Sequence, residues 1–227
     1  MLVAAAFCPH PPLLVPRVAA GAAGELDGLR AACDEAVRRL LAAEPERLYV
    51  MGAGERARCH GPGDHGSFAG YGVDLTVRLG PARHSGADSL PLPITVGVWL
   101  LGRAGDHPPA AGAQVGPDGA APPLDLRGRV GLLVMGDGSA RRTDTSPGYA
   151  DPRAAPFDAG VEQALAAGDP ADLATLDLGL GAELLAAGVP AWRAAGALLG
   201  GGRYAAELLY AGAPYGVGYL VASWVPR

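Results

Sequence analysis

Hydrophobic and polar positions follow strand and helix periods in the first quarter of the chain. Leu2 to Phe7 is a short apolar run that ends in a proline-rich turn, which predicts a buried strand. From Glu25 to Glu44 the apolar positions recur at helical spacing, with acidic residues in the first turn and Pro45 beyond the end. Arg47 to Gly52 is apolar again and predicts a second strand.

The middle of the chain has a weaker pattern. Ala53 to Gly70 has the composition of a loop, and Gly72 to Leu79 alternates like a half-exposed strand. Pro91 to Arg103 is apolar on all sides, and its length favours a buried helix. Asp106 to Pro123 is rich in proline, glycine and alanine and predicts a surface excursion, with one short strand at Ala113 to Val115.

The strongest buried-strand pattern of the chain is Arg129 to Met135, which glycines bound on both sides. A polar loop, Ser139 to Arg153, follows it. The remaining segments are predicted helices at Phe157 to Ala167, Pro170 to Ala187 and Pro190 to Leu199, then strands at Arg203 to Tyr210 and Gly216 to Trp224.

The order of these elements predicts the fold class. Strands and helices alternate over the first two thirds, which is typical of an α/β sheet with helices on its faces. The last two strands are joined by a short turn and should form an antiparallel hairpin. We therefore expect one α/β domain over residues 1–227, with a central mixed β-sheet flanked by helices and a C-terminal antiparallel hairpin.

The composition and charge of the chain limit the classes of partner that we expect. The net charge is −5, and all 18 basic side chains are arginines scattered along the chain, which argues against a nucleic-acid partner. No apolar run reaches the roughly 18–20 residues that span a bilayer, so no membrane partner is expected. Three cysteines without a disulfide spacing fit a reducing compartment, and we expect a cytoplasmic protein.

Histidines follow the first two predicted strands. In an α/β sheet, ligands bind outside the carboxyl ends of the strands, so His10, His60 and His65 could converge there as transition-metal ligands. The alternative is that His60 and His65 are solvated loop residues. Cys8 and Cys59 could add thiolates for a zinc site, although a buried cysteine without a metal is the commoner outcome.

A second group of polar residues follows the strongest strand. Asp137 could orient an imidazole, or it could close the strand end as an Asx turn. Ser139, Arg141 and Arg142 could bind an anionic group of a ligand, or they could be a solvated loop. The chain has neither a phosphate-binding glycine loop before a helix nor a G-x-S-x-G nucleophile motif.

Three segments resemble signature blocks of one superfamily. They are CPHPPLLVP at residues 8–16, GDGSARRTDTSPGYADPRAAPFD at residues 136–158 and YAGAPYGVGYLVA at residues 210–222. In order and spacing they are similar to the LigB-like members of the class III extradiol ring-cleavage dioxygenase superfamily. The resemblance implies an α/β fold with a central mixed sheet. It also implies Fe(II) held by two histidines and one glutamate, open positions for a catechol-type diol and O₂, and a further histidine as acid/base.

The chain departs from that pattern at most of the chemical positions. His10 matches the first iron-binding histidine. The second is expected directly after strand two, where the chain reads MGAGE at residues 51–55. Ala140 stands in place of the acid/base histidine, and Ala211 in place of the glutamate. A single imidazole does not retain Fe(II), because the affinity of such sites comes from several ligands acting together.

Two functional hypotheses follow. In the one we favour, the protein is dioxygenase-like with a degenerate metal site, does not cleave rings, needs no cofactor, and keeps a cleft for a small aromatic ligand or a partner. In the other, it is an active non-haem Fe(II) or other metal dioxygenase that opens a catechol-type substrate. Its rearranged ligands would then be His10, His60, His65 and Glu55.

In the active alternative, Asp137 would support the metal ligands through a hydrogen bond, and Ser139 and Arg141 would line the cleft. A homologous subunit that supplies the missing groups, or a homo-oligomer, is a third arrangement. The apolar segment Leu90 to Leu101 could provide such an interface, although core burial is the commoner fate of an apolar run.

Overall fold

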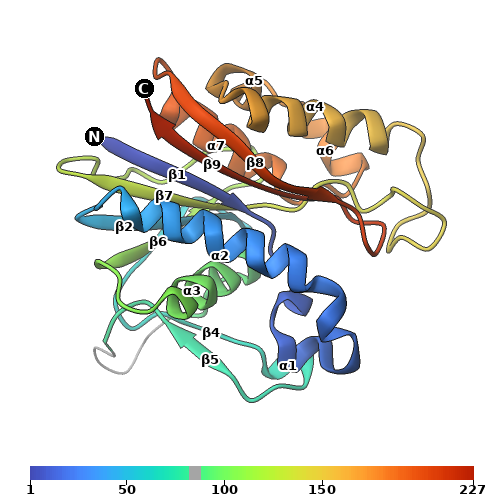
Figure 1. Cartoon of the computed structure of the whole chain (residues 1–227), viewed down its shortest axis with the longest axis horizontal. Helices are drawn as coiled ribbons and strands as arrows, with labels where there is room; N and C mark the ends of the chain where they lie inside the picture. Colours follow the sequence, from blue (N-terminus) through green and yellow to red (C-terminus); the bar gives the residue numbers. More distant parts are fainter. Residues whose placement is uncertain (82–87) are drawn as a thin grey trace.

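The computed structural model describes residues 1–81 and 88–227 and has a mixed β-sheet at its centre (Figure 1). Seven strands pair in the order β3-β6-β2-β7-β1-β9-β8, and two short strands form a separate sheet, β4-β5. Their bounds are β1 (Leu2–Cys8), β2 (Arg47–Ala53), β3 (Arg58–His60), β4 (His65–Ser67), β5 (Thr76–Arg78), β6 (Ala110–Val115), β7 (Val130–Met135), β8 (Tyr204–Gly212) and β9 (Tyr219–Pro226).

Strands β6, β2, β7 and β1 are parallel to one another, so their carboxyl ends lie at one edge of the sheet. The outer strands run the other way: β3 is antiparallel to β6, and β9 is antiparallel to both β1 and β8. The expected mixed sheet and the C-terminal antiparallel hairpin are therefore confirmed.

Helices cover both faces of the sheet (Figure 1). Helices α2 and α3 pack on one face, and α4, α5 and α7 on the other, with α6 beside α7. Their bounds are α1 (Pro16–Ala19), α2 (Asp27–Ala42), α3 (Leu92–Ala104), α4 (Ala154–Ala167), α5 (Pro170–Ala174), α6 (Leu178–Glu183) and α7 (Val189–Leu199). Three short 3₁₀ helices are η1 (Pro12–Leu14), η2 (Ala20–Leu26) and η3 (Ala69–Tyr71).

The long helix α2 shows why one face of each helix is buried. Leu29, Cys33, Val37 and Leu40 recur at intervals of three or four residues and are at most 1% exposed. They belong to the core between the sheet and α2, which also contains Cys8 of β1. The alternate residues of β1 point to the opposite face and join the core under α4 and α7.

Several predicted elements have different limits in the structure. The strand expected at residues 72–79 is only β5, paired with β4 outside the main sheet. The strand expected at residues 113–115 is the end of β6, a buried member of the main sheet, so residues 106–123 are not only a surface excursion. The loop expected at residues 53–70 contains β3 and β4.

The helix expected at residues 170–187 is also different, because it is divided into α5 and α6. Asp177 accepts a hydrogen bond from the amide of Leu180 at 3.0 Å and so begins a new helix within the predicted one.

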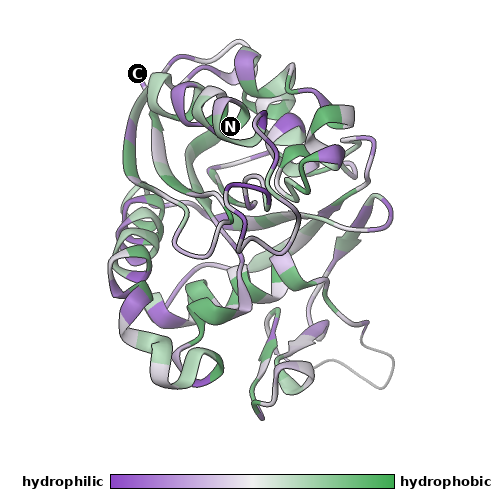
Figure 2. Cartoon of the chain, turned by 90° about the vertical axis from the view of Figure 1, so that its right-hand side faces the viewer, coloured by the Kyte–Doolittle hydropathy of each residue, from purple (hydrophilic) through white to green (hydrophobic). Residues whose placement is uncertain are grey.

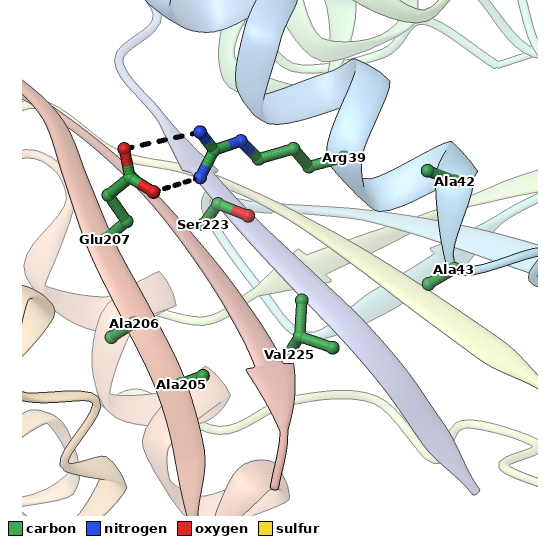
Figure 3. Close-up of a pocket in the computed structure, with 8 residues that line it drawn as sticks. All are labelled: Arg39, Ala42, Ala43, Ala205, Ala206, Glu207, Ser223 and Val225. Atoms are coloured by element: carbon green, nitrogen blue, oxygen red, sulfur yellow. Dashed lines mark hydrogen bonds and ion pairs between the residues drawn. The ribbon is translucent and has the colours of Figure 1, made fainter.

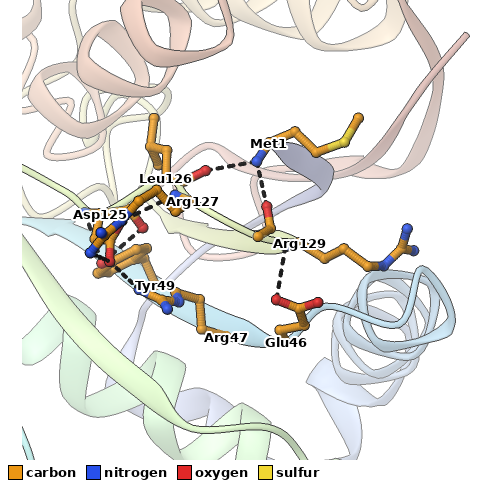
Figure 4. Close-up of polar contacts among 9 residues, drawn as sticks. Met1, Glu46, Arg47, Tyr49, Asp125, Leu126, Arg127 and Arg129 are labelled. Atoms are coloured by element: carbon orange, nitrogen blue, oxygen red, sulfur yellow. Dashed lines mark hydrogen bonds and ion pairs between the residues drawn. The ribbon is translucent and has the colours of Figure 1, made fainter.

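Polar contacts close the edge of the sheet at which the parallel strands begin (Figure 4). The Met1 ammonium donates to the carbonyls of Leu126, at 2.7 Å, and Gly128. The Tyr49 hydroxyl accepts from the amide of Asp125 at 3.1 Å. These contacts fix the chain on the approach to β7, at the edge opposite the carboxyl ends of the strands. None of the helices within residues 1–81 and 88–227 has the length and apolar content to cross a membrane.

Candidate functional site

His10 and Asp137 meet at the carboxyl ends of two neighbouring strands, the edge that Figure 2 turns toward the viewer. The parallel register pairs Cys8 of β1 with Met135 of β7, and each residue of interest lies two positions further on. The backbone amide of His10 donates to Asp137 Oδ1 at 2.7 Å. The Nδ1 atom of His10 lies 3.5 Å from the same oxygen. The structure therefore brings these two predicted site residues together.

Backbone hydrogen bonds hold Asp137 in place from both sides. The amide of Gly136 donates to the carbonyl of Cys8 at 2.9 Å, and the amide of Gly138 donates to the carbonyl of Gly218 at 2.7 Å. The carbonyl of Asp137 accepts from the amide of Gly188 at 2.8 Å. Contacts with Cys8, Gly188 and Gly218 therefore fix the backbone on both sides of Asp137. The loop does not have to change conformation for the carboxylate to contact His10.

The pair is almost completely removed from water. His10 is 6% exposed, and its Nδ1 is buried without a hydrogen bond in the part of the chain that the structure describes. Burial raises the pKa of Asp137, while the charge of His10 and the donation from its amide oppose that shift. A proton on Nδ1 directed toward the carboxylate leaves Nε2 as a hydrogen-bond acceptor. The pair can then accept a hydrogen bond from a ligand.

Two positions at the end of β2, where the resemblance places a second iron-binding histidine, have no space for a side chain. A Cβ atom at Gly52 would lie 2.5 Å from Cβ of Pro93 in the first turn of α3. A Cβ atom at Gly54 would lie 2.5 Å from Nε2 of Gln114. Both distances are shorter than real Cβ contacts. The beginning of α3 and the Gln114 side chain therefore occupy the volume that an imidazole would need.

His60 does not reach His10. It lies in β3 at the far edge of the sheet, four strand spacings of about 4.8 Å, or about 19 Å, from β1. Its imidazole is buried between the carboxylate of Asp64, at 3.1 Å from Nδ1, and the side chain of Gln114, at 2.9 Å from Nε2. It is therefore neither a solvated loop residue nor a neighbour of His10, and the expected convergence with His10 is wrong for this residue.

Asp64 organises the loop around His60. Burial opposes ionisation of its carboxylate, but donation from the amides of Asp88 and Gly61 and from His60 outweighs that effect, so its pKa is lowered. The two amide contacts are 3.0 and 3.2 Å long. Nε2 of His60 therefore links β3 to Gln114 of β6, and Nδ1 links β3 to Asp64 in the loop that follows β3.

The remaining predicted ligands do not complete a metal site. His65 lies in β4 of the small sheet, with Nδ1 buried and without a hydrogen-bond partner among the described residues. Glu55 is exposed. No three of the described histidine, cysteine, aspartate and glutamate side chains form a group that could hold a metal ion. His10 and Asp137 supply one nitrogen and one carboxylate, and this donor set does not fit Fe(II) held by two histidines and a carboxylate.

Ser139 and Arg142 bind a carboxylate that the sequence analysis missed. The amide and hydroxyl of Ser139 donate to the two oxygens of Asp158, each at 2.8 Å, and Arg142 Nη1 donates to Oδ2 at 3.0 Å. Asp158 lies in α4 and is 2% exposed. A carboxylate at a buried helical position, three residues before Val161, was the signal that could have revealed it, because buried charges require partners.

This network has a structural role. It ties the loop after β7 to α4, next to Asp137. Because the Ser139 hydroxyl is already donated to Asp158, it is not free to act as a nucleophile or to bind a ligand. Arg141 is half-buried, and its Nε has no hydrogen-bond partner within the described residues. Ala140 makes backbone contacts to Leu184 and Gly148 at 3.0 Å.

The cysteines are dispersed. Cys8 and Cys33 are buried on the α2 side of the sheet, and burial raises the pKa of Cys33, with Cys8 beside it. Cys59 is exposed on β3, so Cys8 and Cys59 lie on strands at different places in the sheet.

A separate surface hollow of about 380 Å³ lies between the end of α2 and the C-terminal hairpin (Figure 3). Four alanines and Val225 contribute much of its lining. Its charged side chains, Arg39 and Glu207, form an ion pair with each other. Because these two side chains neutralise each other, the hollow has little net charge with which to attract a ligand.

Comparison with known proteins does not assign the chain to a group. No family model matches the sequence, and no curated protein matches it.

Proposed function

We propose that the protein is a class III extradiol dioxygenase-like protein with a degenerate metal site, and that it binds a small phenolic ligand at His10 and Asp137 without cleaving it. The observation that carries the proposal is the buried contact between these two residues at the carboxyl ends of β1 and β7. This edge is where α/β sheets bind ligands. The three sequence blocks that resemble the superfamily include both residues.

The chemistry of the pair favours a ligand that donates a hydrogen bond. His10 offers Nε2 as an acceptor when Nδ1 carries the proton directed at Asp137. A phenolic hydroxyl that donates to Nε2 shares its proton with the imidazole through that hydrogen bond. A ligand that carries a carboxylate close to Asp137 would instead meet charge repulsion.

Three observations favour this proposal over an active dioxygenase with rearranged ligands. Gly52 lies against Pro93, so this position at the end of β2 has no space for a side chain that could bind a metal. His60 is held by Asp64 and Gln114 on a distant strand. Glu55 is exposed.

The test uses 4-nitrocatechol, whose absorption spectrum changes when its hydroxyl ionises. We expect protein treated with a chelator to bind it and to shift its spectrum toward that of the ionised form. Replacing His10 with alanine or Asp137 with asparagine should each weaken binding about 10-fold, the usual effect of losing one hydrogen bond to a charged group. The exposed His107 provides the control, and His107→Ala should bind like the wild type.

A second measurement distinguishes the two hypotheses. Protein incubated anaerobically with Fe(II) and desalted should retain far less than one equivalent of iron, and it should not open catechol on exposure to O₂. Stoichiometric iron that His10→Ala abolishes, together with a ring-opened product, would contradict the proposal.

A further inference from the structure

A second surface hollow lies between α6 and the start of α7, and we call it the α6 hollow. Its volume is about 370 Å³, within the roughly 300–1,000 Å³ that is usual for small-molecule pockets. All of its lining residues are leucine, valine, alanine, proline or glycine, and they include Pro117, Leu178, Ala182, Leu185, Val189 and Pro190. Because no polar side chain lines it, the hollow favours an aliphatic group.

Leu185, in the wall of the hollow, has a backbone conformation that usually belongs to glycine. The amide of Ala186 donates to the carbonyl of Gly181 at 2.8 Å, and the amide of Leu185 donates to that of Ala182 at 3.1 Å. These are the two hydrogen bonds of a Schellman motif, in which glycine is the common residue at the position of Leu185. Leu185 has a φ of 56° and is 46% exposed. Neither its backbone nor core burial therefore accounts for a leucine here.

Arg141 lies beside this wall. The amide of Ala140, the preceding residue, donates to the carbonyl of Leu184 at 3.0 Å, which brings the two loops together. A Cβ atom at Gly148 would lie 2.9 Å from Cγ of Arg141 and 3.0 Å from Cδ1 of Leu185. The side chains of Arg141 and Leu185 therefore pack on the same glycine.

The guanidinium of Arg141 has no carboxylate partner in the described part of the chain. Three nearby carboxylates are paired with other arginines: Asp158 with Arg142, and Asp151 and Glu183 with Arg153. Nε of Arg141 is buried without a hydrogen bond within residues 1–81 and 88–227. A guanidinium without an acceptor gains strong hydrogen bonds when an anion binds to it. An aliphatic hollow and an unpaired cation thus lie side by side.

We propose that the α6 hollow binds the alkyl chain of an amphipathic carboxylate, whose carboxylate group accepts hydrogen bonds from Arg141. The ligand class is a medium-chain fatty acid or a molecule of the same chemistry. Leu185 forms the wall between the alkyl chain and the charged group. The site does not depend on the proposed function, since neither His10 nor Asp137 lines the hollow.

The experiment compares octanoate with 1-octanol by isothermal titration calorimetry of the full chain. Octanoate should bind at one site, and 1-octanol should bind about 10-fold more weakly because it lacks the charge. Arg141→Met should weaken octanoate binding about 10-fold and leave the affinity for 1-octanol unchanged. Arg127→Met is the matched control. It removes the same charge from a side chain that is 91% exposed, and it should bind both probes like the wild type.

Leu185→Gly tests the apolar part of the site. Because glycine suits the left-handed conformation at this position, the variant should be at least as stable as the wild type in thermal unfolding. Loss of the leucine should weaken the binding of octanoate and of 1-octanol alike, by about 5- to 10-fold. A folded protein that has lost affinity for both probes would support the assignment of the alkyl chain to the hollow.

Three results would overturn the proposal. The first is that the wild type does not bind octanoate, and the second is that Arg141→Met and Leu185→Gly bind it as the wild type does. The third is that Arg127→Met loses as much affinity for octanoate as Arg141→Met does, because only the net charge of the chain would then matter. Binding of 4-nitrocatechol is measured separately, so none of these results decides the proposed function.

Discussion

Asp137 is a residue at which stability and the proposed ligand binding oppose each other. Its pKa is raised because burial disfavours the ionised form. The folded state therefore bears a cost at any pH above the raised pKa, and that cost is relieved as the pH falls through it. Residues that bind ligands commonly carry such a cost.

We expect Asp137→Asn to be more stable than the wild type at pH 7, by on the order of 1 kcal/mol or about 2–4 °C. The amide oxygen of asparagine can still accept from the amide of His10, while the buried charge is removed. Because the cost falls as the wild-type carboxylate gains its proton, the difference should shrink as the pH is lowered toward 4. Thermal unfolding between pH 4 and pH 7 measures it.

Asp151 is a control whose substitution should change stability in the opposite direction. Hydrogen bonds from the side chain and amide of Arg153 lower the pKa of Asp151 to about 2. Its ionised form is favoured by the fold, so Asp151→Asn should be less stable than the wild type at neutral pH. That difference should disappear as the pH falls toward 2. An Asp137→Asn variant that is destabilised equally at every pH would show that the carboxylate of Asp137 is not under strain from burial.

At the scale of elements, the contact between β2 and α3 decides what the carboxyl edge can hold. Pro91 and the following proline-containing turn begin α3 directly over the end of β2, where only glycine leaves sufficient space. A histidine at Gly52 would have to displace the first turn of α3. The packing of these two elements therefore keeps a histidine side chain from position 52 at this edge.

Gly52→Ala should lower the free energy of unfolding by about 1–3 kcal/mol, the usual cost of overpacking, because its Cβ would overlap Pro93. Gly102→Ala in α3 is the matched control. Nothing lies within 4 Å of a Cβ at Gly102, so alanine should stabilise the helix by about 0.5–1 kcal/mol. Urea unfolding of both variants measures the difference. A neutral Gly52→Ala would show that α3 can move away from β2.

Long elements with a regular pattern were predictable from the sequence, and short elements were not. β1, β2, β7, α2, α3 and the hairpin all have apolar positions at a constant period, and their limits are close to those predicted. The strands β3 and β4 have three residues each and include His60 and His65. Their pairing depends on contacts with distant segments, such as that of His60 with Gly112, which no local pattern records.

The candidate site was predictable only where it follows long strands. His10 and Asp137 come directly after β1 and β7, so the rule for strand ends located both. Asp158, which binds Ser139 and Arg142, lies in α4, 19 residues after Ser139 in the sequence. Its position depends on the packing of α4, which becomes visible only in the folded chain.

At the scale of the whole molecule, two cores share one sheet. Leu29 of α2 is buried in one core, and Leu165 of α4 is buried in the other. Successive residues of β1 and β7 contribute to the two cores in turn. Both cores therefore depend on the same strands, and the strands cannot lose their backbone hydrogen bonds without disrupting both cores. We therefore predict that the chain unfolds as one cooperative unit over residues 1–227.

Matched Leu29→Ala and Leu165→Ala variants test this prediction, because each removes one leucine that is at most 1% exposed. Each should destabilise the protein by about 2–5 kcal/mol. In a Trp99→Phe background, the fluorescence comes from Trp192 and Trp224, which both lie in the core that contains Leu165. If the molecule is one unit, Leu29→Ala will shift the fluorescence transition as far as the far-UV circular dichroism transition, although Leu29 is on the opposite face of the sheet. A fluorescence midpoint that stays in place while the circular dichroism midpoint falls would mean that the two faces unfold independently.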